Sequence, residues 1–122
     1  MRGLLDTHIL LWALADDPKL SPAHRAMIAE PDNEFFVSAI AVAEVSIKTS
    51  LGKLKASGFY ESLREADFRE LPFTAAHAEA LRELPWHHRD PFDRMLVAQA
   101  ITERLDLVTT DARLRAYPVV CV

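Results

Sequence analysis

Four acidic residues are the candidates for chemistry in this sequence: Asp6, Glu44, Asp93 and Asp111. Asp6 and Asp111 each directly follow a short β-rich run, while Glu44 and Asp93 lie in stretches predicted to be helical. If the four carboxylates converge, their mutual repulsion is severe unless a cation lies between them. Carboxylate oxygens suit Mg²⁺ or Mn²⁺, which keep several waters and take up phosphate oxygens. A metal held in this way can activate water for phosphodiester hydrolysis.

Three of these acids also have a purely structural interpretation. Asp6 and Asp111 could simply cap the helices that follow them, because aspartate is among the best N-cap residues. Glu44 could form an exposed i,i+4 ion pair with Lys48. However, residues 39–45 are apolar apart from Glu44, which predicts a well-buried helix in which a glutamate needs a partner. Capping, ion pairing and metal binding therefore all remain open for these acids.

The stretch HRDPFDRM, residues 88–95, contains two aspartates next to a predicted helix start. Asp90 before Pro91 matches an N-cap followed by proline at the first helical position. Asp93 then falls at the third helical position, where a capping box or the helix dipole also favours an acid. We expect Asp90 to act mainly as the cap and Asp93 mainly as a ligand.

The elements that must position these acids alternate along the chain. Such alternation implies parallel crossovers, and hence an α/β fold with a central parallel β-sheet of about five strands and helices on both faces. Ligands in such sheets bind beyond the carboxyl ends of the strands, near the point where strand order reverses. The predicted strands lie at residues 3–5, 35–38, within 68–73, 106–109 and 118–122, and the predicted helices at 7–15, 22–30, 39–50, 57–66, 75–82 and 91–104, with a short helix after Asp111.

Length and composition predict one soluble globular domain spanning residues 1–122. The formal charge of −4 argues against simple backbone-driven binding of duplex DNA, but it does not exclude a nucleic-acid enzyme whose acids bind a cation. No apolar run is long enough to span a membrane, and the N-terminus lacks a signal-peptide pattern. The single cysteine, Cys121, fits a reducing cytoplasm.

Other chemistries find less support in the sequence. The five histidines, His8, His24, His77, His87 and His88, show no zinc-ligand spacing with cysteine, and three glycines are too few for a glycine-rich phosphate loop. A receiver-type phosphoacceptor domain would need an acidic pair after the first strand and a lysine after a late strand, and the chain has neither. His87 and His88 could contact a substrate or lie in a solvated turn before the helix.

Several motifs together resemble one known family. LLDTHILLWAL near the start, a glutamate in the helix after the second strand, IKTSLGKL, LPWHHRDPFDRMLVAQA and LVTTD occur in the order found in PIN-domain toxins of the VapC type. The resemblance extends from residue 3 to the end of the chain. It implies a small α/β nuclease that cleaves RNA with Mg²⁺ or Mn²⁺, that a co-expressed VapB-type antitoxin holds inactive, and that commonly forms a homodimer.

The resemblance carries the family's acidic positions onto Asp6, Glu44, Asp93 and Asp111, which become the expected metal ligands and catalytic residues. Asp90 lies outside these four. Relatives often have tryptophan just before the helix glutamate, where this chain has Ala43; this departure affects packing behind Glu44 and removes no ligand. The resemblance therefore implies a metal-dependent endoribonuclease, the toxin of a type II toxin–antitoxin pair. The alternative is a catalytically silent PIN-fold module that binds RNA or an antitoxin.

Neighbouring residues have expected supporting roles. Thr7 and Thr110 are expected to hydrogen-bond nearby carboxylates. Arg89 and Arg94 could contact phosphate or could instead be solvated or ion-paired.

The first helix, ILLWALA, carries more large apolar side chains than one core-facing side needs, including Leu10, Leu11, Trp12 and Leu14. This surplus indicates either a surface for a protein partner or a helix buried on two sides.

Overall fold

Four parallel strands form the central sheet in the computed structural model, which describes residues 1–122. The strands are β1 (Arg2–Leu5), β2 (Glu34–Ser38), β3 (Arg69–Leu71) and β4 (Asp106–Val108), arranged in the order β3-β2-β1-β4. Leu4 of β1 pairs with Phe36 of β2 on one side and with Leu107 of β4 on the other. The prediction of a parallel α/β sheet is confirmed.

The helices begin at the capping residues that the sequence indicated. Ser21, Ser38 and Thr74 each accept a hydrogen bond from a backbone N–H in the first turn of the helix that follows. None of the helices has the length and apolar character needed to cross a membrane. The helices are α1 (Thr7–Leu14), α2 (Pro22–Ala29), α3 (Ala39–Ser50), α4 (Phe59–Glu65), α5 (Ala75–Ala80) and α6 (Pro91–Glu103), with short 3₁₀ turns at η1 (Leu81–Glu83) and η2 (Ala112–Ala116).

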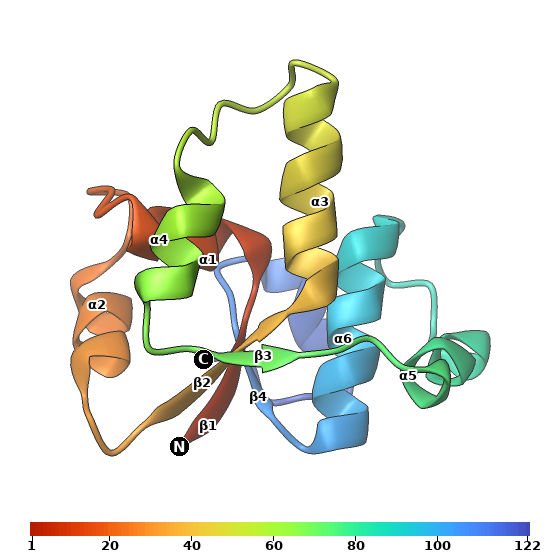
Figure 1. The fold of residues 1–122 in the computed structure, drawn as a ribbon. Helices are drawn as coiled ribbons and strands as arrows, with labels where there is room; N and C mark the ends of the chain where they lie inside the picture. Colours follow the sequence, from red (N-terminus) through yellow and green to blue (C-terminus); the bar gives the residue numbers. More distant parts are fainter.

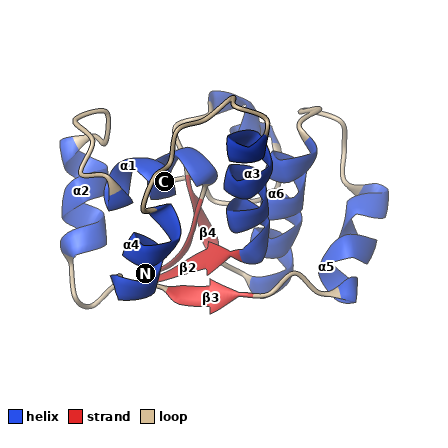
Figure 2. Ribbon diagram, turned by 45° about the horizontal axis from the view of Figure 1, so that its top comes forward, coloured by secondary structure: helices blue, strands red, loops and turns tan.

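Helices cover both faces of the sheet, with α1, α2 and α4 on one side and α5 and α6 on the other (Figure 1). Figure 2 shows the same layers from a second direction, with α3 beside α6. Because side chains alternate along a strand, Leu4 packs toward α6 while its neighbour Leu5 packs toward α1. Each face of the sheet therefore has its own hydrophobic core.

Two contacts fix the position of α6, which carries Asp93. The hydroxyl of Ser38, at the carboxyl end of β2, donates to Oε1 of the buried Gln99 of α6. Nε2 of Gln99 donates to the carbonyl of Pro72, 3.3 Å away, just after β3. Buried amide groups need such partners, so this side chain ties α6 to the carboxyl ends of two strands.

Two predicted elements are shorter than expected. The predicted strand at residues 118–122 is reduced to an isolated parallel bridge between Leu107 and Cys121, although the backbone N–H groups of Leu107 and Thr109 donate to the carbonyls of Val120 and Val122. The predicted start of α4 at Ser57 is wrong by two residues. Gly58 there has a φ of 74°, a left-handed conformation that favours glycine and lies outside the helix.

Candidate active site

The carboxyl ends of β1 and β4 flank the point where strand order reverses. β1 lies between β2 and β4, so the chain leaves β1 toward one side of the sheet and later returns to pair on the other. Asp6 follows β1 and caps α1, and Asp111 follows β4 and caps η2. Both acids thus lie at the edge of the sheet where doubly wound folds bind their ligands.

Asp6 acts as a helix cap and also lies on this edge. One carboxylate oxygen accepts a hydrogen bond from the Ile9 N–H at 2.8 Å, and the other accepts from the Thr109 hydroxyl. The Thr109 oxygen in turn accepts from the backbone N–H of Asp111 at 3.0 Å, which links the two acids. Burial raises the pKa of Asp6 above its ordinary value, so the ionised form is less stable in the metal-free fold than in water. Thr109 takes the supporting role that was expected of Thr110, which is exposed.

Glu44 is buried in the second turn of α3, with only 3% of its surface exposed. The Thr7 hydroxyl donates to Oε1 at 2.7 Å, and the Lys48 ammonium lies 2.5 Å from Oε2. The i,i+4 pair with Lys48 therefore forms, but the alternative of an exposed pair is wrong: Glu44 is buried and has a partner, as the apolar residues around it predicted. Thr7 hydrogen-bonds a carboxylate as expected.

The two aspartates of HRDPFDRM have different surroundings. Asp90 Oδ1 accepts from the backbone N–H groups of Phe92 and Asp93, at 2.8 and 3.1 Å, which confirms its predicted role as the N-cap of α6. Asp93 is in the first turn, and its carboxylate takes no part in the capping hydrogen bonds. Burial, followed by repulsion from Asp90, raises the pKa of Asp93 to about 6. Asp93 is thus the carboxyl in this region whose charge is poorly compensated.

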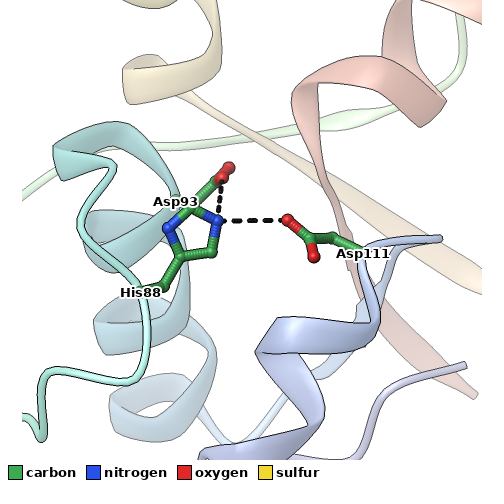
Figure 3. Close-up of side chains that lie close together, drawn as sticks. All are labelled: His88, Asp93 and Asp111. Atoms are coloured by element: carbon green, nitrogen blue, oxygen red, sulfur yellow. Dashed lines mark hydrogen bonds and ion pairs between the residues drawn. The ribbon is translucent and has the colours of Figure 1, made fainter.

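His88 lies between two of the acids, as Figure 3 shows. Its Nε2 is 3.2 Å from Asp93 Oδ2 and 3.1 Å from Asp111 Oδ2. Its other ring nitrogen, Nδ1, lies 3.0 Å from the backbone N–H of Asp90 and must accept that hydrogen bond. Nε2 therefore carries a proton and donates toward the two carboxylates. The interpretation of His88 as part of a solvated turn is wrong, because only 6% of the residue is exposed.

Asp111 differs from Asp93 in having an arginine beside it. The Arg113 guanidinium lies 3.0 Å from Oδ1 and 2.9 Å from Oδ2 of this carboxylate. This contact lowers the pKa of Asp111 to about 2. The surroundings of these two acids thus shift their pKa values in opposite directions: the pKa of Asp93 is raised and that of Asp111 is lowered.

All four predicted acids line one pocket with a volume of about 520 Å³. The acids come from the ends of β1 and β4 and from the early turns of α3 and α6. His88 and Asp90 line the same pocket, as do the cationic side chains of Lys48, Arg89 and Arg113. Four carboxylates that are far apart in the sequence therefore line the same pocket.

Arg94 does not reach this pocket, although Asp93 precedes it. Its guanidinium is buried and donates to the carbonyls of Pro85 at 2.7 Å and Leu84 at 3.1 Å, and to the Tyr117 hydroxyl at 3.2 Å. The expectation that Arg94 contacts phosphate, is ion-paired or is solvated is therefore wrong. It instead fixes the loop that leads into His88, whose N–H donates to the same Tyr117 hydroxyl at 3.0 Å.

The donor groups of the pocket fit a hard divalent cation. One carboxylate oxygen of Asp93 and one of Asp111 lie within 4.8 Å of each other and of Nε2 of His88. Oxygen donors of this kind suit Mg²⁺ or Mn²⁺. The raised pKa values of Asp6 and Asp93 indicate negative charge that a bound cation would stabilise. Because the His88 proton lies on Nε2, the histidine fits a role in orienting the carboxylates.

Comparison with known protein families agrees with this geometry. A model described as the PIN domain matches residues 3–120. The chain belongs to the PIN domain family. No protein with a curated description matches it in sequence.

Solved structures with the same PIN fold span nearly the full length of the chain. VapBC2 from Rickettsia felis, bound to a DNA fragment from its promoter, has a TM-score of 0.76 at 20% identity and covers 100% of this chain and 98% of that one. VapC20 from Mycobacterium tuberculosis, a toxin that cleaves the Sarcin-Ricin loop, has a TM-score of 0.67 at 17% identity, with coverages of 97% and 96%. A toxin–antitoxin complex from Klebsiella pneumoniae has a TM-score of 0.67 at 22% identity, with coverages of 98% and 95%.

Proposed function

We propose that this PIN domain is a metal-dependent endoribonuclease and the toxin component of a type II toxin–antitoxin pair. The proposal rests on one observation: Asp6, Glu44, Asp93 and Asp111 line one pocket at the edge of the sheet where strand order reverses. Four carboxylates around one polar pocket are costly for stability, as the raised pKa values of two of them indicate. A role in binding a divalent cation accounts for that cost.

In this proposal Asp6, Asp93 and Asp111 hold Mg²⁺ or Mn²⁺ directly or through water. When bound, the ion lowers the pKa of a water molecule and offsets the charge that develops on the phosphate. Glu44, held by Thr7 and Lys48, orients the attacking water or the ion.

The pocket also offers positive charge for an RNA backbone. The Lys48 ammonium lies against Glu44, the Arg113 guanidinium lies against Asp111, and Arg89 is exposed. Five acids line the same pocket, so these three cations offset only part of its negative charge, and a bound divalent ion would offset the rest. A phosphodiester would then meet the local charge of the pocket and not the formal charge of −4 of the whole chain.

The proposed antitoxin partner has a candidate surface beside the active site. Leu11, Trp12 and Leu14 of α1 are half-buried and line a groove of about 440 Å³ together with Phe59 of α4. Leu10 is fully buried, so some of the large apolar side chains of α1 pack in the core and others line this groove. Several solved structures with the PIN fold are complexes of a toxin with an antitoxin. We propose that an antitoxin occupies the groove, that the chain forms homodimers, and that this one-domain protein acts in the cytoplasm.

The test is incubation of the purified chain with mixed cellular RNA in Mn²⁺, in Mg²⁺ and in excess chelator. We expect discrete cleavage products with at least one of the metals and none with chelator. The silent-module alternative predicts RNA or antitoxin binding with no cleavage under any of these conditions. Cleavage that persists in chelator would contradict the assignment of the acids to a metal.

A further inference from the structure

Trp86 is the large hydrophobic side chain with the greatest exposure in the molecule, at 75%. A tryptophan this exposed removes little apolar surface from water, so the fold gains little stability from it. It lies in the loop between η1 and α6 and lines the pocket that contains the four acids.

The Trp86 ring is supported from one side. The Arg94 guanidinium lies 3.7 Å from the ring centroid, close enough for a cation–π contact. Arg94 is itself only 4% exposed and is held by the carbonyls of Leu84 and Pro85 and the Tyr117 hydroxyl. The exposed surface of the ring therefore belongs to its other face and its edges. A flat aromatic face with a fixed, buried support is preorganised for stacking.

The composition of the pocket indicates what would stack there. Apart from Trp86, every residue that lines the pocket is an acid, a base or a histidine. A nucleotide matches this arrangement, because its base is a flat ring and its phosphate is an anion that Lys48, Arg89 and Arg113 can contact. The core of a protein interface, in contrast, is depleted of charged residues around its aromatic anchors.

We propose that Trp86 stacks on an unpaired nucleobase next to the phosphate that enters the acidic pocket. This inference rests on the proposed ribonuclease function and adds to it a residue that contacts a base of the substrate. Stacking requires a base that is free of a duplex, so Trp86 would contact an unpaired nucleotide. Stacking on an aromatic side chain tolerates any base, so the contact selects unpaired structure and not sequence.

Binding can be measured with Ca²⁺ in place of Mn²⁺ or Mg²⁺, with a labelled oligouridine of about eight nucleotides, because Ca²⁺ also binds carboxylate oxygens and offsets the charge of the acids in the pocket. The chain has two tryptophans, so Trp12→Phe leaves Trp86 as the single indole fluorophore. We expect saturable quenching of that fluorescence by the single strand and little quenching by the same strand in a duplex. Trp86→Ala should weaken RNA binding about tenfold or more, while Trp86→Phe, which keeps a stacking face, should stay within about threefold of wild type.

Thermal unfolding of each variant serves as the folding control, and an exposed side chain of this kind should be dispensable for the fold. Equal RNA affinity for wild type and Trp86→Ala, with no quenching, would overturn the stacking proposal even if the wild type cleaves RNA. Loss of binding to a co-expressed protein partner with unchanged RNA affinity would also overturn it and would assign Trp86 to a protein interface. Quenching and weakened binding in a chain that never cleaves RNA would support Trp86 as an RNA contact and refute the nuclease function.

Discussion

Replacing Asp93 by Asn should stabilise the metal-free protein while it destroys activity. The pKa of Asp93 is raised from 3.8 to about 6. A pKa difference of about two units means that ionisation of Asp93 destabilises the folded state by about 3 kcal/mol relative to the unfolded chain. Because the Asp93 side chain is 22% exposed, solvent screening reduces this figure, and we expect a gain of roughly 2 kcal/mol in the free energy of unfolding.

The gain should depend on pH in a defined direction. The folded pKa of Asp93 lies above its unfolded value, so ionisation lowers stability as the pH rises. The difference between variant and wild type should be absent below about pH 4 and complete above about pH 6, on the basis of these two pKa values. For a chain of 122 residues, roughly 2 kcal/mol corresponds to a rise in Tm of roughly 6–10 °C at pH 8.

The assay is thermal unfolding in excess chelator at pH 4 and pH 8, followed by the same scans with Mn²⁺. The wild type should gain stability from Mn²⁺ by mass action, and the variant should gain little. Asp90→Asn is the matched control, because asparagine caps a helix as well as aspartate, and it should change stability by less than about 1 kcal/mol. An Asp93→Asn variant that is no more stable than wild type at pH 8, with a difference that does not change with pH, would refute the reasoning.

Two further variants test the groups that hold the carboxylates. Lys48→Met should lower the free energy of unfolding by about 1–2 kcal/mol in urea titrations, because it leaves the buried Glu44 carboxylate without its cation. The double variant Lys48→Met with Glu44→Gln should recover most of that loss, because the buried charge is then absent. His88→Phe should weaken Mn²⁺ binding about tenfold by calorimetry, because it removes the hydrogen-bond donor between Asp93 and Asp111. His88→Gln keeps an N–H donor, so its affinity for Mn²⁺ should stay within a few-fold of wild type. Unchanged Mn²⁺ affinity in His88→Phe, or no recovery in the Lys48 double variant, would contradict these assignments.

The sequence could predict the parts of the site that depend on local rules. Ser38, Asp90 and the proline after it mark helix starts through capping chemistry, which operates within a few residues. The position of Asp6 and Asp111 follows from the parallel topology, because each comes directly after a strand. These features need no knowledge of how distant segments pack.

The missed features depend on packing between distant segments. His88 meets Asp111 only because Arg94 and Tyr117 fix the loop before α6, and no spacing in the sequence records that contact. Helical geometry does give one usable signal: consecutive residues are about 100° apart around a helix, so Arg94 could not share the direction of Asp93. Likewise, whether Thr109 or Thr110 supports Asp6 depends on where β4 ends, and strand ends are hard to assign from sequence.

The most direct test of the central claim is the rate of RNA hydrolysis as Mn²⁺ is added back to chelator-treated protein. We expect no cleavage without the metal and a rate that rises to saturation as Mn²⁺ is added. The rate for Asp93→Asn should be at least about a hundredfold lower at every Mn²⁺ concentration, which corresponds to the loss of about 3 kcal/mol of transition-state stabilisation. Asp90→Asn should retain most of the activity. Cleavage that is insensitive to chelator, or an Asp93→Asn variant as active as wild type, would contradict the account.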